Sequence, residues 1–162
     1  MRNKNGFTII ETLTAIFVLT AGVVGAITFI NQALRAGKTD SSRLVASYLA
    51  QEGMEVVRNI RDSNFLKERL GQPAVWTDGL LECSAGCEAD YNSLNLQPLD
   101  RYLKFDNGFY NYDSGQDTSF KRKITISQFG TDCLAVEVAV SWQERGNNYN
   151  FAAESRLCKW LQ

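Results

Sequence analysis

Glu11 raises the first chemical question in this sequence. It is the only charged residue from Phe7 to Ile30. An acidic residue at the centre of a membrane helix costs about 2.5–3.5 kcal/mol, and one near the end of the helix costs less but still needs a polar partner. The segment itself offers no cation, so the position of Glu11 predicts that its carboxylate pairs with a group from outside the segment.

The four cysteines are the second set of residues that can do chemistry. Cys133 and Cys158 flank the last predicted hairpin symmetrically, and Cys83 and Cys87 lie close together in "CSAGC". We expect Cys133 to pair with Cys158, while Cys83 and Cys87 can close a small loop, although four cysteines allow three pairings and the sequence excludes none. The alternative is a structural zinc site held by all four thiolates, but the usual C-x2-C pairs are absent.

Three carboxylates, Asp106, Asp113 and Asp117, lie in the loop-rich stretch "DNGFYNYDSGQD". A calcium site is the functional interpretation of such a cluster. The EF-hand spacing is absent, so we expect solvated turn carboxylates and predict no metal site.

The composition excludes several classes of function. Histidine is absent, which removes the commonest general base and metal ligand and makes histidine-based triads impossible. The formal net charge is −1, so no broad basic face for nucleic acid is expected. No nucleophile and base are recognisable as a pair, and we predict neither an enzyme nor a cofactor.

The segment that carries Glu11 is long enough to cross a bilayer. Residues 7–30 would span roughly 36 Å as a helix. Arg2 and Lys4 precede the segment and the next cation is Arg35, so the positive-inside rule predicts a cytoplasmic amino terminus and a single crossing. A cleaved secretory signal fits poorly, because its apolar region normally has about 7–15 residues.

The stretch "KNGFTIIETLTAIFVL" resembles the amino termini of type IV prepilins and of the pseudopilins of type II secretion. The pattern of that family is a short basic leader, a glycine, then phenylalanine or methionine, with glutamate as the fifth residue of the mature chain. Here the leader would be residues 1–6, the new amino terminus Phe7, and the fifth residue Glu11. The resemblance implies cleavage between Gly6 and Phe7 by the prepilin peptidase, N-methylation of Phe7, and pairing of Glu11 with the amino terminus of a neighbouring subunit.

The resemblance also implies partners and a location. The partners are the prepilin peptidase, other pilin or pseudopilin subunits, the inner-membrane assembly platform and membrane lipid. The protein would begin in the bacterial inner membrane and end in an extracytoplasmic filament or at the cell surface.

Residues 31–72 are expected to form an amphipathic linking helix. Apolar residues recur there at helical spacing, and Gly71 and Pro73 would end the helix, while Gly37 with the following "TDSS" would bend or break it. The predicted apolar stripe consists of Leu44, Val45, Tyr48, Leu49, Val56, Val57 and Ile60. The stretch "LVASYLAQEGMEVVRNIRDSNFL" looks like the corresponding part of minor pilins of the pilus-modification class and of I-type minor pseudopilins.

Residues 73–162 are expected to form an extracytoplasmic β-rich domain. Asn107-Gly108 predicts a hairpin turn, and "KITISQF" and "CLAVEVAVSW" alternate apolar with other residues as half-buried strands do. We predict an antiparallel meander of three or four strands, covered on one face by the long helix, and an α+β, type IV pilin-like fold. Three aromatic residues are expected to pack in the core or at an edge, with a partner surface as the alternative: Trp76, Tyr110 and Tyr112.

The sequence therefore predicts a non-enzymatic minor pilin or minor pseudopilin. Within the family, the alternative is a major subunit or a DNA-uptake pilin. Outside it, the alternative is an unrelated ectodomain protein held by a single membrane span, and the Gly6-Phe7 junction together with Glu11 speaks against that alternative.

Overall fold

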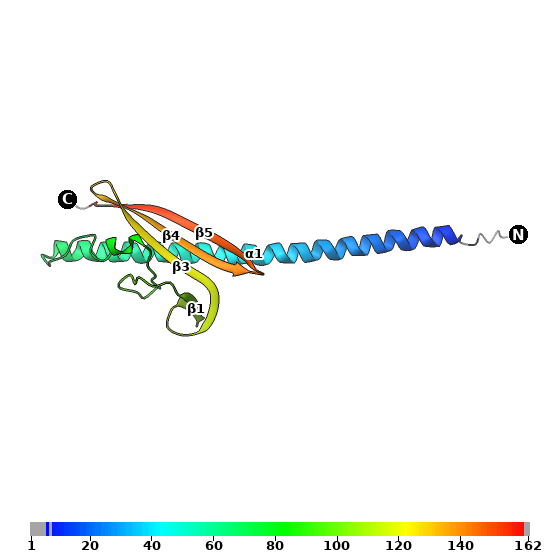
Figure 1. Cartoon of the computed structure of the whole chain (residues 1–162), viewed down its shortest axis with the longest axis horizontal. Coiled ribbons are helices and arrows are strands. Elements are labelled where there is room, and N and C mark those ends of the chain that lie inside the picture. The colour runs from blue at the N-terminus through cyan, green and yellow to red at the C-terminus, as the bar shows by residue number, and fades with distance from the viewer. Residues whose placement is uncertain (1–5, 7, 161–162) are drawn as a thin grey trace. The chain divides into compact units, whose positions relative to one another are not determined.

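The computed structural model describes residue 6 and residues 8–160, and Figure 1 shows its course. The chain divides into two compact units, Met1–Ser41 and Ser42–Gln162. One helix, α1 (Ile9–Arg69), contributes to both.

Helix α1 ends where the sequence predicts. Gly71 has a positive φ of 74°, and the amide of Gln72 donates to the carbonyl of Lys67 while the amide of Gly71 donates to the carbonyl of Glu68. This is a Schellman motif, which glycine favours because a side chain resists positive φ. The expected bend at Gly37 is not present, and the helix is continuous there. A single glycine and the polar "TDSS" lower helix propensity but leave every backbone hydrogen bond available, whereas a proline would not.

The second unit contains a five-stranded antiparallel sheet in the order β2-β1-β3-β4-β5. Its strands are β1 (Tyr102–Asp106), β2 (Phe109–Asn111), β3 (Gln116–Phe129), β4 (Cys133–Glu144) and β5 (Asn147–Cys158). A short 3₁₀ helix, η1 (Leu81–Ser84), precedes them.

The α+β class and the antiparallel sheet covered by the helix are confirmed, but the strand count and one connection need correction. The sheet has five strands instead of three or four, and β3 pairs with β1 instead of continuing the meander from β2. The β1–β2 hairpin does turn at Asn107-Gly108. Strand β2 is only three residues long and offers few backbone groups for pairing. Strand β3 pairs instead with the other edge of β1.

The core lies between the inward face of the sheet and the second half of α1. Every second residue of β4 is buried, as the alternation predicts. These residues are Leu134, Val136, Val138, Val140 and Trp142.

The helix face that meets the sheet confirms most of the predicted stripe. Leu49, Val56 and Val57 are buried, and Val45 and Ile60 are partly buried against the core. Leu44 and Tyr48 remain 55% and 61% exposed. Three of the buried residues in this part of the helix are alanine or glycine. The buried residues are Ala46, Leu49, Ala50, Gly53, Met54, Val56 and Val57. The small side chains of Ala46, Ala50 and Gly53 allow the helix backbone to lie close to the sheet, so the buried face is shifted towards them and away from Leu44 and Tyr48.

A buried arginine links the elements around this core. Arg122 on β3 is 1% exposed. Its Nη1 donates to the carbonyl of Leu49 at 3.0 Å and to Oε1 of Glu52 at 2.8 Å, and its Nη2 donates to the carbonyl of Ala89. Arg122 therefore ties the sheet to α1 and to the segment before β1, since a buried charge needs such partners.

Candidate functional site: the amino-terminal segment

Helix α1 begins immediately after Thr8. The amide of Glu11 donates to Oγ1 of Thr8 at 3.3 Å, and the amide of Thr12 donates to the carbonyl of Thr8. Thr8 thus caps the helix, and "TIIE" has the spacing of a capping box, in which a threonine is followed three residues later by a glutamate. From the sequence, only an intermolecular role is predicted for Glu11. The same residue is also part of the signal that starts the helix.

The hydroxyl groups of the apolar half of α1 are satisfied within the helix. Thr14, Thr20 and Thr28 each donate to a carbonyl three or four residues earlier, at 2.8–3.0 Å. Such bonds remove the cost of placing a hydroxyl in lipid. The side chain of Glu11, by contrast, forms no hydrogen bond or ion pair within the described part of the chain. Its carboxylate is free to accept a cation from another molecule.

The predicted cleavage junction lies just before this cap. Gly6 is exposed and outside the helix, and a Cβ added to it would meet no atom within 4 Å. Phe7, the predicted site of N-methylation, lies outside the described residues. The helix begins only at Ile9, three residues after Gly6.

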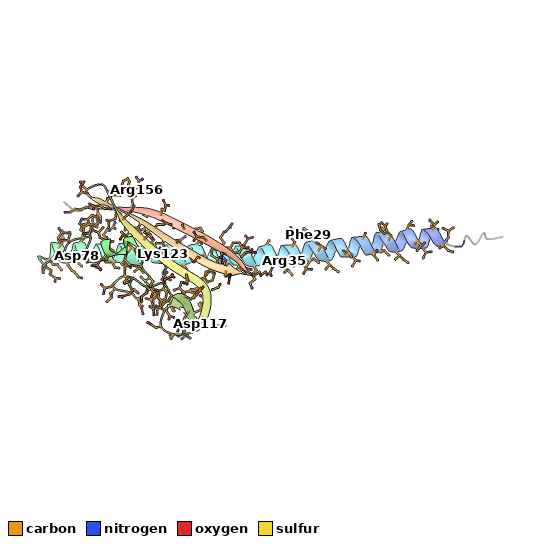
Figure 2. All side chains as sticks on the ribbon, viewed as in Figure 1. Phe29, Arg35, Asp78, Asp117, Lys123 and Arg156 are labelled. Atoms are coloured by element: carbon orange, nitrogen blue, oxygen red, sulfur yellow. A yellow bond between two sulfur atoms is a disulfide. The ribbon has the colours of Figure 1, made fainter. Side chains whose placement is uncertain are left out.

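The apolar half of α1 is long and apolar enough to cross a membrane, and none of its apolar window is buried within the structure. Its large side chains are among the most exposed of the described chain, for example Ile9 at 82% and Phe29 at 73%. Figure 2 labels Phe29, near the end of the apolar segment, and Arg35, the first charged residue after that segment. Lipid or neighbouring subunits would have to cover these side chains, because water does so at a high free-energy cost.

The sequence-predicted residues of the second unit lie apart from this segment in the chain. Two disulfides are present, Cys133–Cys158 and Cys83–Cys87. Cys133 and Cys158 are directly opposite in the β4–β5 register. Among the described residues no group of three metal-ligating side chains comes together.

Asp106, one of the three loop carboxylates, and the three aromatic residues make local contacts. Ser114 donates to the carboxylate of Asp106 at 3.1 Å. Trp76 and Tyr112 are 7% and 6% exposed and belong to the core, as the packing interpretation predicts, while Tyr110 is half-buried at its margin. These residues provide packing and turns, so the second unit does not present the aromatic partner surface that was considered.

Burial raises the pKa of one of these aromatic residues, Tyr112, to about 12, although the nearby positive charge of Arg122 lowers this pKa. The cause is desolvation, which disfavours the phenolate. Near this ring, the hydrogen bond from Arg101 to the buried carboxylate of Glu88 raises the pKa of that guanidinium.

Comparison with known proteins bears on the amino-terminal segment. No curated protein and no solved structure matches the chain significantly. Residues 1–27, however, match the family model described as the prokaryotic N-terminal methylation motif. These residues contain the predicted leader and cleavage junction, the Thr8 cap and Glu11, and the chain therefore carries the signature of the type IV prepilin-like proteins.

Proposed function

We propose that this protein is a structural, non-enzymatic subunit of a type IV pilus or type II secretion filament, in the role of a minor pilin or minor pseudopilin. The match of residues 1–27 to the N-terminal methylation motif is the observation that carries the proposal. In this proposal the prepilin peptidase cleaves between Gly6 and Phe7 and methylates the new amino group, and the subunit joins the filament through α1.

The arrangement of α1 supports this role. Its apolar half leaves its side chains exposed, and its second half packs on the sheet. A subunit of this design can exchange lipid for the helices of neighbours without refolding its sheet. In such a helix bundle, Glu11 would meet the positively charged amino terminus of another subunit in a medium of low dielectric constant, where opposite charges attract strongly.

Processing is the direct test. Intact mass spectrometry of membrane-extracted protein, from cells with an active prepilin peptidase, should show loss of residues 1–6 and one added methyl group on Phe7. Gly6→Leu should block this cleavage, because a branched side chain crowds a site that accepts the smallest residue.

Gly22→Leu is the matched control, because neither Gly6 nor Gly22 has an atom within 4 Å of an added Cβ. The same side chain placed at Gly22 should leave cleavage intact. A mature wild-type protein that retains the leader would contradict the proposal.

A further inference from the structure

The outer edge of β5 is long, regular and uncovered. β5 pairs with β4 over its full length without a bulge, and it contains no proline. On its other side no further strand of the described chain is present. Folded proteins usually interrupt such an edge with a bulge, a proline or a covering element, because unpaired backbone groups bind other strands.

The turn before β5 determines which backbone groups point to this edge. Arg145 and Gly146 both have positive φ, 53° and 81°, which is the two-residue hairpin turn of type I′. Glu144 and Asn147 flank this turn and therefore form a pair that shares both hydrogen bonds. Hydrogen-bonded pairs alternate along an antiparallel ladder. The even-numbered residues of β5 consequently direct their N–H and C=O groups away from β4.

These edge-facing residues are accessible. All of them are exposed: Asn148, Asn150, Ala152, Glu154, Arg156 and Cys158. Within the described chain their backbone groups form no other hydrogen bond. A groove of about 660 Å³ lies between α1 and the middle of this edge. Its lining residues are Tyr48, Gln51, Glu52, Met54, Glu55 and Arg58 on the helix and Ala153, Glu154 and Ser155 on the strand. The edge thus has room beside it for the inward side chains of one more strand.

The solvent face of the sheet indicates which charge would suit a strand that paired with this edge. Glu137 and Glu154 are directly opposite on β4 and β5, and like charges in this position destabilise a sheet. Neither forms an ion pair among the described residues. The cation nearest in sequence, Arg156, stacks on the ring of Phe129 at 4.1 Å instead. Figure 2 labels Arg156 on this outer strand.

We propose that the free edge of β5 binds an extended segment of a different protein as a sixth strand, with a lysine or arginine opposite Glu154. The backbone edge specifies an extended polypeptide, as in other cases of strand addition. The unbalanced pair of Glu137 and Glu154 specifies the charge. This inference goes beyond the filament role and does not depend on it.

A second copy of this chain is a poorer occupant than a different protein. Apart from β5, the described sheet has one other edge, β2, which is only three residues long. A second β5 could pair antiparallel with the first. Arg156, the only cation of β5, would then lie opposite Glu154 only in a register where the carboxyl-terminal halves of the two strands overlap. That register leaves Asn148 and Asn150 unpaired and takes Arg156 from Phe129.

Peptide binding to the full-length chain in detergent micelles tests the proposal. The probe is a labelled peptide of about ten residues, the length of a long strand, in which valine and threonine alternate around one central lysine. Two matched peptides carry glutamate at that position or N-methyl groups on the amides that would face the edge. We expect the lysine peptide to bind roughly three- to fivefold more tightly than the glutamate peptide, as a cross-strand ion pair allows. The N-methylated peptide should bind at least about tenfold more weakly.

Two variants of the chain sharpen the result. Ala152→Pro removes one edge-facing N–H while leaving the β4–β5 hydrogen bonds intact, so it should weaken binding in a chain that still unfolds in one cooperative thermal transition. Glu154→Lys should reverse the preference between the lysine and glutamate peptides.

Several outcomes would overturn the proposal. These are the absence of binding, equal binding of the N-methylated peptide, unchanged binding to Ala152→Pro, or an unchanged charge preference in Glu154→Lys. A dimer of the full-length chain that Ala152→Pro dissociates would assign the edge to a second copy instead.

Discussion

At the scale of single residues, Arg122 and Glu11 illustrate two different positions for a charge. Arg122 is buried and finds its partners inside the second unit, in Glu52 and in two carbonyl groups. Glu11 has no side-chain partner in the described chain, although its backbone amide takes part in the helix cap. The first charge therefore holds the fold together, whereas the second remains available for contact with another molecule.

Tyr112 permits a prediction about alkaline pH. Its hydroxyl is buried without a hydrogen-bond partner in the described chain, and burial raises its pKa to about 12 from 10.0. The folded state therefore keeps the proton more tightly than the unfolded state does. The resulting stability is fully present below about pH 10 and is lost as the pH rises towards about 12.

Tyr112→Phe should lack this contribution. At pH 7 its free energy of unfolding should be within about 1 kcal/mol of the wild type, because no hydrogen bond to the hydroxyl is lost. Between about pH 10 and 12 the wild type should lose up to about 2–3 kcal/mol more than the variant. Denaturant unfolding at several pH values measures the difference, and parallel pH profiles for the two proteins would contradict it.

At the scale of secondary-structure elements, the contact of α1 with the sheet depends on a glycine. A Cβ added to Gly53 would lie 2.9 Å from Cγ1 of Val138 and 3.0 Å from Cδ of Arg122. Gly53→Ala should therefore destabilise the second unit by about 1–3 kcal/mol through overpacking, although alanine is the better helix former by about 1 kcal/mol. Thermal unfolding measures this effect.

Gly37→Ala is the control for Gly53→Ala. It places the same substitution in the same helix, where nothing lies within 4 Å, and it should be neutral or slightly stabilising. A stabilised Gly53→Ala variant would show that the helix does not lie as close to β4 as the structure places it.

The disulfide between β4 and β5 is a second test at this scale. Cys133 and Cys158 are separated by 25 residues, and a loop of that size corresponds to about 3 kcal/mol in the loop-entropy treatment. Because Cys133 is half-buried and Cys158 exposed, replacing both with serine should lose mainly the cross-link. Non-reducing peptide mapping should find this pair in exported protein. Free thiols at both positions, or stoichiometric zinc, would overturn the assignment.

The elements that the sequence predicts well are those with a strong local signal. The helix end at Gly71, the Asn107-Gly108 turn and the alternation of β4 all follow from local backbone and side-chain preferences. The helix face was predicted less well, because contact with the sheet selects small residues such as Ala46 and Ala50 over the exposed Leu44 and Tyr48. Hydrophobicity alone does not encode how closely two elements approach.

Within the candidate site, the cleavage junction and the pairing of Glu11 follow from the family resemblance and stay predictions. The Thr8 cap was missed although "TIIE" carries its signal. The burial of Arg122 was also missed. It is in phase with Ile124 and Ile126 on β3, which was the available sign of an inward position. A charged residue in that phase is normally exposed, and only the tertiary partners from α1 and the segment before β1 make its burial possible.

At the scale of the whole molecule, the two units differ in what they need from their surroundings. The second unit buries its own core and closes it with two disulfides. The first unit buries none of its apolar window, which fits a membrane-anchored protein. The chain alone is thus an incomplete structure, and lipid or other subunits must complete it.

Glu11→Ala tests whether neighbouring subunits cover the apolar half of α1. Insertion into the membrane and cleavage after Gly6 should persist, because the substitution removes a costly group from the membrane helix and leaves the junction intact. Filament entry should fail, because a neighbouring amino terminus would remain a desolvated cation. Loss of one member of such a pair costs about 3–5 kcal/mol, which corresponds to a fall in incorporation of roughly two orders of magnitude or more. Glu11→Gln should be similarly impaired, since it keeps the size and loses the charge.

Thr14→Val is the control, because the hydroxyl of Thr14 forms a hydrogen bond only within its own helix among the described residues. Comparing membrane pools with sheared filaments measures incorporation, and equal recovery of Glu11→Ala and wild type in filaments would make Glu11 a residue of the helix cap alone.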